Sequence, residues 1–373
     1  MKLKNRALLA AGTLALAALI AGSASAQTAP APKWYDGISL NGMVGASYSY
    51  NTNKPDSGLN GYRVFDFDDN TFKLDVVELV VQKPVAEAGD IGFRFDLTAG
   101  GSVPRIAASS GLFRDSVTGK AEDFDLQQGY VSWMPSSGFR IDFGKFITHM
   151  GAELIEGYDG YNDNFSRSIL FGYAIPFTHT GLKASYAFSS SFSAMAMVAN
   201  GWDNVKDNNR GKTFGAQLLF TPAPMFTAYL NYVGGPERSG SSDARHVFDV
   251  VAVIKPMDLV TLTLNYDYGK EKNGAGSHDA QWTGFAAIAR FNISGTFALS
   301  VRGETFKDRD GARTGAAQRL TECTLTPEFK VKDRLVIRPE VRFDRSNEST
   351  FEKSGGRTSK KQTTLALNTL YVF

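Results

Sequence analysis

The amino-acid sequence predicts an all-β protein, a transmembrane antiparallel β-barrel of about 16 strands with short periplasmic turns and long extracellular loops. Three observations predict this fold: apolar and polar residues alternate with a period of two, short and long connections alternate along the chain, and aromatic residues recur beside the short connections. The mean hydropathy is −0.20, and no apolar run of about 20 residues follows residue 26, which excludes a bundle of transmembrane helices. The 40 basic and 38 acidic residues, with 12% aromatic residues, exclude a disordered chain, and a single cysteine excludes a disulfide scaffold.

The first 26 residues are predicted to be a secretory signal peptide. Three basic residues precede the apolar stretch 7–20, and the small residues Ala24, Ser25 and Ala26 form a cleavage site. An anchoring helix is the alternative, but the apolar stretch is short for a membrane span. Cleavage would remove three positive charges and no negative one, so the net charge would change from +2 to −1. Because the mature chain would be nearly neutral, nucleic acid is not an expected partner. The expected organisation is a signal peptide (1–26), a short periplasmic segment (27–37) and the barrel (38–373).

The strands are predicted from segments with one apolar and one polar face. In residues 335–344, the four charged residues Arg338, Glu340, Arg342 and Asp344 alternate with mostly apolar ones. A helix would distribute these charges around its circumference, whereas a strand places them all on one face. The centres of the predicted strands are Val44, Val77, Phe95, Val131, Phe143, Lys183, Ala196, Gln217, Tyr229, Ala252, Leu264, Ala287, Ser300, Leu325, Arg338 and Leu367.

The alternation is interrupted at two positions. In residues 72–82 the apolar set changes parity, which a β-bulge near Val76 would explain. Lys145 shares the parity of the lipid-facing Phe143, so it either lies at the outer rim or marks a second bulge. Cys323 shares the parity of Leu325 and is expected to face lipid as a small residue.

The connections place all short turns at one end of the barrel and all long loops at the other. The long connections are expected at residues 52–70, 101–124, 148–176 and 346–359, with briefer loops between them. Phe188 and Phe192 flank one short turn, and Phe220 and Phe226 flank another, as in the interfacial aromatic girdle of a membrane barrel. A closed barrel pairs every backbone group and has no edge strands, so it suits lipid better than a soluble sandwich does.

Several stretches resemble the outer-membrane β-barrel porins of the OmpL-like family. The resemblance is dense from about Phe67 to Asn209, and it includes residues 67–79, 90–105, 142–146, 156–164 and 201–204. It implies a Gram-negative outer-membrane pore for passive diffusion of ions and small hydrophilic solutes, with no catalytic residue and no cofactor. The terminal Phe373 resembles the signal that the barrel-insertion machinery reads, and general porins imply a possible homotrimer. The other expected partners are outer-membrane lipid and lipopolysaccharide.

A barrel of about 16 strands encloses an aqueous lumen, so inward charges are expected to line a pore. Opposite charges on this wall can tune ion selectivity, or they can pair with one another and stiffen the wall. The two roles are compatible. The predicted pore-lining residues are Lys73, Asp75, Glu78, Arg94, Asp96, Arg140, Asp142, Arg302, Glu304, Arg338, Glu340, Arg342 and Asp344.

The third long connection, residues 148–176, is the candidate constriction loop. By order and length it is similar to the loop that narrows the lumen of sixteen-stranded porins. Its charged residues are Glu153, Glu156, Asp159, Asp163 and Arg167. We expect these carboxylates to face Arg94 and Arg140 across the lumen; an ordinary extracellular loop is the alternative.

Other functions lack a supporting motif. The four histidines have no metal-ligand spacing, and no Ser/His pair indicates a barrel enzyme. A plugged transporter needs a large N-terminal plug, whereas only residues 27–37 precede the first strand. A structural or adhesive barrel is the main alternative to a porin, and the absence of a pore current would indicate it.

Overall fold

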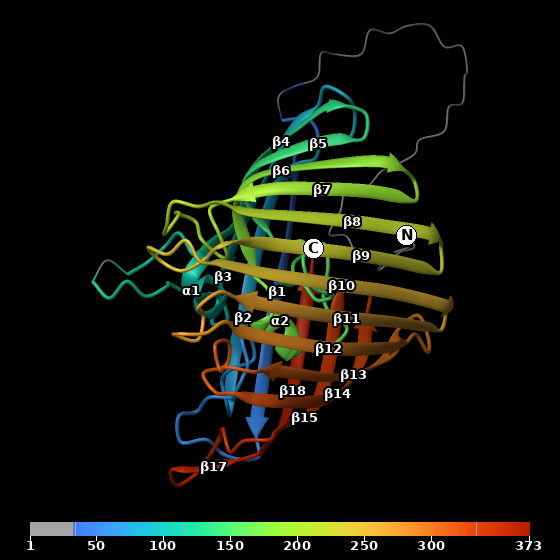
Figure 1. Ribbon diagram of the computed structural model, residues 1–373. Helices are drawn as coiled ribbons and strands as arrows, with labels where there is room; N and C mark the ends of the chain where they lie inside the picture. Colours follow the sequence, from blue (N-terminus) through green and yellow to red (C-terminus); the bar gives the residue numbers. More distant parts are fainter. Residues whose placement is uncertain (1–32, 34, 116, 333) are drawn as a thin grey trace, which may run out of the picture.

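The computed structural model describes residue 33 and residues 35–115, 117–332 and 334–373, and they form a closed barrel of antiparallel strands (Figure 1). The predicted signal peptide lies outside the described residues, as does most of the segment 27–37. Neighbouring strands pair in sequence order, and β1 (Ser39–Asn51) pairs with β18 (Lys361–Val372) to close the sheet. The barrel order β1-β18-β15-β14 and onward to β2 contains sixteen strands, which confirms the predicted fold class and strand number.

All the predicted strand centres lie within barrel strands. The first half of the barrel continues with β2 (Thr71–Lys83), β3 (Ile91–Ala99), β4 (Phe124–Ser136), β5 (Phe139–Ile147), β6 (Thr178–Ser189), β7 (Phe192–Ala199) and β8 (Thr213–Ala223). The second half consists of β9 (Phe226–Pro236), β10 (Ala244–Met257), β11 (Val260–Glu271), β12 (Ala280–Phe291), β13 (Phe297–Asp308), β14 (Gln318–Val331), β15 (Leu335–Ser346) and β18.

The long connections contain elements that the sequence pattern did not predict. Helix α1 (Val103–Ser110) lies between β3 and β4, and helix α2 (Ile169–Tyr173) lies between β5 and β6. The last loop carries a small hairpin of β16 (Phe351–Lys353) and β17 (Arg357–Ser359). Neither described helix has the length and apolar character that a membrane crossing would need.

The outer surface of the barrel is apolar, and the charged residues of the strands lie mostly inside. Phe72 is 87% exposed and Phe143 is 66% exposed, whereas Arg302 and Arg338 are 0% exposed. At the short turns aromatic rings pack together: Phe188 stacks on Phe192 with ring centroids 5.2 Å apart. Cys323 is exposed on this outer face, in agreement with the expectation from its parity.

Both interruptions of the alternation have a backbone cause. Gly45 pairs with Val76 and Ala46 pairs with Leu74, so Asp75 is the extra residue of a bulge and turns inward, one residue from the predicted position. Gly144 has a φ of 143°, and after it Lys145 turns inward, where its Nζ lies 2.7 Å from Asp125 Oδ2. Lys145 therefore does not lie at the outer rim; the conformation of Gly144 changes the parity of β5 without a register shift.

The Gly144→Ala variant is expected to destabilise the barrel by about 2–3 kcal/mol, because a φ of 143° is strained for any residue with a side chain. The added Cβ would also meet the Gly129 carbonyl oxygen at 2.2 Å. Gly303→Ala is the matched control, since the nearest atom to its Cβ would be 4.0 Å away. Urea unfolding of both variants in lipid vesicles measures the difference, and equal midpoints would contradict the strain at Gly144.

Candidate functional site

The connection between β5 and β6, residues 148–177, crosses the inside of the barrel and is called the lumen loop below. Near its start the Gly151 N–H donates to Asp249 Oδ1 of β10 at 3.2 Å. At its tip the Tyr158 N–H donates to Glu78 Oε2 of β2 at 2.7 Å, and near its end the Ala174 carbonyl accepts from the Trp282 indole of β12 at 3.1 Å. The loop thus contacts strands on opposite sides of the lumen instead of projecting outward.

Two arginines of β13 and β15 hold the lumen loop through both its side chains and its backbone. Arg302 contacts Glu153 Oε1 at 2.8 Å and the Ser166 carbonyl at 2.6 Å. Arg338 contacts Glu156 Oε1 at 2.8 Å and the Asn162 carbonyl at 2.7 Å. Each guanidinium therefore satisfies several loop acceptors that burial would otherwise leave without a partner.

Acidic residues of the same strands receive the loop's backbone N–H groups. Glu304 accepts from the Ile169 N–H at 2.6 Å, at the start of α2. Glu340 accepts from the N–H groups of Phe165 and Ser166 at 2.8 and 3.0 Å. Since the wall supplies both donors and acceptors, it fixes the position of the whole segment 165–170.

Two guanidinium groups lie beside the carboxyl of Glu156, which is only 5% exposed. Burial alone raises the pKa of this carboxyl, but the guanidinium groups of Arg167 and Arg338 outweigh burial and hold its pKa below the usual range. Arg167 Nη2 lies 3.3 Å from Glu156 Oε2, so the carboxylate bridges the loop's own arginine and the wall.

The acidic residues of the lumen loop do not all face the basic residues that we expected. Asp159 Oδ2 lies 2.6 Å from Arg94 Nη1, as the sequence suggested. Arg140, however, pairs with Asp142 of its own strand at 2.7 Å. The other three loop carboxylates reach the opposite wall: Glu153 contacts Arg302, Glu156 contacts Arg338, and Asp163 contacts Arg290 at 3.0 Å. The reason is the path of the loop, which runs against β13 and β15 before its tip reaches β2 and β3 and returns to β12 and β14 after the tip.

The two sides of the lumen differ in their exposure to water. On β3, β5 and β6 the side chains of Arg94, Arg140 and Lys183 are 14%, 27% and 23% exposed. On β13 and β15 the arginine side chains under the loop are 0–1% exposed. Water therefore reaches the lumen wall beside the loop's tip rather than beneath its anchored part.

An apolar cluster lies at the extracellular ends of the strands and is called the mouth cluster below. It includes Phe65 of the first long loop, Phe171 and Phe177 of the lumen loop, Trp282 of β12 and Phe351 of β16. The Phe171 and Phe177 ring centroids are 5.4 Å apart, and Phe65 lies 6.0 Å from Phe171. The cluster ties three loops together above the lumen.

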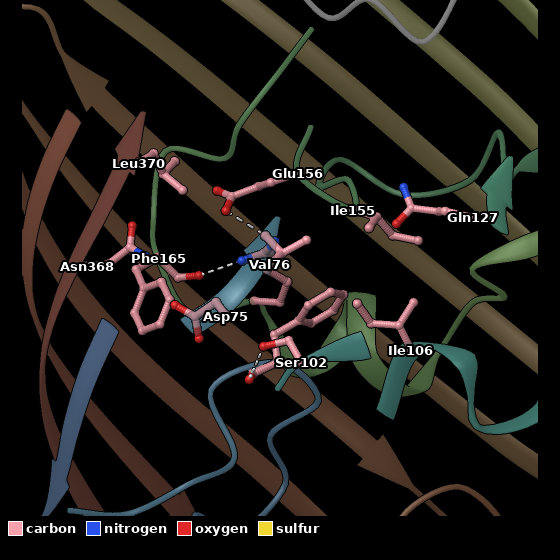
Figure 2. A pocket seen from close by; sticks show the side chains of 12 residues that line it. Asp75, Val76, Ser102, Ile106, Gln127, Ile155, Glu156, Phe165, Asn368 and Leu370 are labelled. Carbon is pink, nitrogen blue, oxygen red and sulfur yellow. Dashed lines mark hydrogen bonds and ion pairs between the residues drawn. The ribbon is translucent and has the colours of Figure 1, made fainter. Parts of the chain in front are cut away.

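A small cavity remains beside the lumen loop. Figure 2 shows the cavity, which is lined by Ile155, Glu156 and Phe165 of the loop together with Asp75 of β2 and Leu370 of β18. Six of the twelve residues that line the cavity are apolar and six are polar or charged, so the loop packs on this side of the barrel against both kinds of side chain.

The other residues predicted to line the pore are also on the inner face. Asp75 accepts from the Ser47 hydroxyl at 2.9 Å, and Lys73 lies 3.0 Å from Asp68. Asp344 pairs with Arg63 at 2.5 Å and with Arg342 at 2.8 Å, and Arg94 pairs with Asp96 at 2.8 Å. All thirteen residues thus lie on one surface, and most of them are in ion pairs; their role in lining a pore stays a prediction. Phe373 bonds Gly42 through its backbone, and its role as an insertion signal is likewise a prediction.

Sequence reasoning missed several charged residues of this surface. Lys183 contacts Asp142 at 3.2 Å, Arg290 joins Asp163 to Glu328, and Glu322 pairs with Arg302 at 2.7 Å. The sequence could have predicted that these residues face inward, since Glu322 and Glu328 alternate with the lipid-facing Cys323 and Leu325. Extending the same alternation to every charged residue would have found them.

A closed sixteen-stranded barrel with an apolar outer face, a charged inner face and a long loop folded inside defines the class of outer-membrane porins. The chain belongs to the family described as "Putative beta-barrel porin-2, OmpL-like", whose model matches residues 37–373. It is therefore an outer-membrane porin channel of the bacterial outer membrane, as the resemblance implied.

Solved structures share this fold at low sequence identity. The anion-selective porin from Comamonas acidovorans has a TM-score of 0.61 at 12% identity, covering 90% of this chain and 99% of that one. OmpF of Salmonella typhi, in complex with daunomycin, has a TM-score of 0.61 at 11% identity, with 91% and 99% covered. The trimer form of OmpT, an outer membrane protein of Vibrio cholerae, has a TM-score of 0.60 at 12% identity, with 90% and 99% covered. No curated protein matches the chain in sequence.

Proposed function

We propose that ions and small hydrophilic solutes diffuse passively through this porin past a cationic strip, formed by Arg94, Arg140 and Lys183. The observation that supports this path is the contrast in exposure: these three side chains are 14–27% exposed, whereas the arginines beneath the lumen loop are almost fully covered. A hydrated solute needs water-accessible polar groups along its route, and the strip supplies them.

The strip presents positive charge to water because its partner carboxylates lie behind it. The side chain of Asp96 is 0% exposed and that of Asp142 is 3% exposed. Asp159, at the tip of the lumen loop, is 35% exposed and faces the strip from the loop. A solute passing between them would cross a transverse field with cations on the wall and a carboxylate on the loop, and such rings of charge tune ion selectivity.

We further infer that the channel works as a pore without catalysis and as a trimer. Diffusion requires no nucleophile or general base, and the charged residues described above either hold the lumen loop or line the proposed solute path. The trimer form of OmpT supports the oligomeric proposal by analogy of fold. Cross-linking of the folded protein in detergent tests it, and a monomer alone on the gel would contradict it.

Replacing residues 153–163 of the lumen loop by a short Gly/Ser linker is expected to raise single-channel conductance several-fold, because the segment carries the contacts that hold the loop across the lumen. Planar-bilayer recording measures the effect. The control is the same replacement of residues 204–210 in the loop between β7 and β8. Unchanged conductance and selectivity would show that the lumen loop is not the constriction, and no channel steps from the folded parent protein would favour a structural or adhesive barrel.

A further inference from the structure

A row of polar side chains crosses the inner face of four neighbouring strands at the start of the lumen loop, and we call it the root row. It consists of Gln217 on β8, Asn231 on β9, Asp249 on β10 and Asp267 on β11, and the register sets each one directly opposite the next. These strands lie side by side in the barrel (Figure 1). Asp249 and Asp267 are both 0% exposed, so the row ends in two buried carboxyl groups on facing positions.

The carboxyl of Asp249 holds the first residues of the lumen loop on the wall. Its Oδ1 accepts from the Gly151 N–H at 3.2 Å. Its Oδ2 accepts at 2.5 Å from the side-chain amide of Asn265 on β11, and that amide in turn accepts from the Ala152 N–H at 3.1 Å. The place at which the loop leaves the wall therefore depends on this one carboxyl group.

The hydrogen bonds of the root row are all directed toward Asp249. Gln217 Nε2 donates to Asn231 Oδ1 at 2.8 Å, and Asn231 Nδ2 donates in turn to Asp249 Oδ1. Both oxygens of Asp249 thus serve as acceptors, which is the hydrogen-bonding pattern of a carboxylate.

Asp267, in contrast, receives no donor. Neither of its carboxyl oxygens has a hydrogen-bond donor among the described residues, and Gly284, opposite it on β12, has no side chain to supply one. The other charged group that acts on it besides Asp249 is Glu304 of β13, which is also acidic, and the groups that act most strongly on the two carboxyls include no arginine or lysine. A second buried negative charge at this place would be very costly, and two carboxyl groups that share a site do not both ionise readily.

A proton fits this pair better than a metal ion does. The neighbouring amides present N–H groups to Asp249, whereas Mg²⁺ and Ca²⁺ take about six or more oxygen ligands. Within the part of the chain that the structure describes, no group of three or more His, Cys, Asp or Glu side chains could hold a metal ion. A proton needs only one oxygen from each of the two carboxyl groups.

We propose that Asp267 carries a proton and donates it to Asp249, and that this shared proton makes the attachment of the lumen loop sensitive to alkaline pH. With the proton in place, the pair has one negative charge, and Gly151 and Ala152 stay bonded to the wall. Raising the pH transfers the proton to hydroxide, which leaves two facing carboxylates that repel each other and require hydration. Water then enters beneath the start of the loop, and this part of the loop leaves β10 and β11. The effect on conductance rests on the proposed function, in which the lumen loop is the constriction.

The test measures the proton and the channel separately, in the parent protein and in the variant Asp267→Asn. The amide of this variant can donate to Asp249 at every pH, so it imitates the protonated acid. The matched control is Asp258→Asn, which removes an exposed carboxyl from the turn of the same β10–β11 hairpin. Infrared difference spectroscopy in lipid vesicles detects the protonated carboxyl, and planar-bilayer recording measures conductance between about pH 6 and about pH 10. Heat-modifiable mobility on gels verifies that each variant is folded, and the infrared titration of the parent needs no variant.

The parent and the control are expected to show the infrared band of a buried protonated carboxyl at neutral pH, and Asp267→Asn to lack it. Toward alkaline pH the band should disappear from the parent, and its conductance should rise reversibly by about twofold. The rise is limited because the loop remains anchored to β13 and β15. The conductance of Asp267→Asn should lack this rise, and since all other titratable groups are common to both proteins, the difference between them isolates the pair.

Two results would overturn the proposal. Identical infrared spectra of the parent and Asp267→Asn at neutral pH would mean that the pair holds no proton, and that a cation balances its charge instead. A band that titrates while both proteins show the same pH dependence of conductance would mean that the proton does not control the loop. The replacement of residues 153–163 keeps this failure distinct from failure of the proposed function, because it tests the constriction at constant pH.

Discussion

Arg302→Met is expected to release the lumen loop from β13, raising single-channel conductance and lowering the free energy of unfolding by about 3–5 kcal/mol. The Arg302 side chain is 0% exposed and contacts both Glu153 and Glu322, at 2.8 and 2.7 Å. Without the guanidinium, the negative charges of these two buried carboxylates would lose the positive charge that balances them. The Ser166 carbonyl would also lose its hydrogen-bond donor. Planar-bilayer recording and urea unfolding in vesicles measure the two effects.

Arg210→Met is the control for this change, because Arg210 is exposed in the loop between β7 and β8. It removes the same charge and should leave both conductance and stability within experimental error. A variant Arg302→Met with the parent's conductance and unfolding midpoint would mean that the loop is held without this arginine, and the anchoring role assigned to it would be wrong.

The double variant Arg94→Gln/Lys183→Gln is expected to shift the reversal potential toward cations, with a several-fold rise in the cation-to-anion permeability ratio. It removes two of the three water-facing cations of the strip and leaves Asp159 in place on the loop. Asp142 keeps its bond to Arg140, and Asp96 keeps its bond from Gln128 at 2.5 Å, so the barrel should still fold. The effect should shrink at high salt, because the Debye length falls to about 3 Å at 1 M.

The double variant Arg319→Gln/Arg345→Gln is the matched control for selectivity, because both residues are exposed on the outer face of β14 and β15. It also removes two positive charges, but from the outer face of the barrel rather than from the lumen. If both double variants changed the reversal potential equally, net charge alone would set the selectivity, and the strip would not be the path of the ions.

The alternation of residues was sufficient to predict the barrel, because each strand has one face in lipid and one inside. The same pattern located the bulge at Asp75 within one residue, since a single extra residue reverses every later side chain. The pattern could not decide whether Lys145 lies at the outer rim or marks a bulge. The side chain changes sides there because of the backbone conformation of Gly144, and no extra residue is inserted into the strand that the sequence pattern could have revealed.

The partners of the lumen loop were less predictable than its existence. Glu153 and Arg302 are 149 positions apart, and nothing in the spacing shows that they meet. Much of the anchoring is also made through the backbone, as between the Phe165 N–H and Glu340, and a backbone donor has no signature in the sequence. Length and order could thus predict an inward loop, whereas the wall that each carboxylate meets depends on the path in three dimensions.

The seam between β1 and β18 has a consequence for the order of assembly. The strands that close the barrel are the first and the last to leave the export pathway, with Met43 paired to Val372. The lumen loop is anchored to β12, β13 and β15, strands that are translated well after the loop itself. Its charged segment therefore stays hydrated and lacks its final partners until the C-terminal strands have been translocated. Closing the seam and burying the loop would then be one event, so a porin with a weakened seam should be trapped with its loop outside.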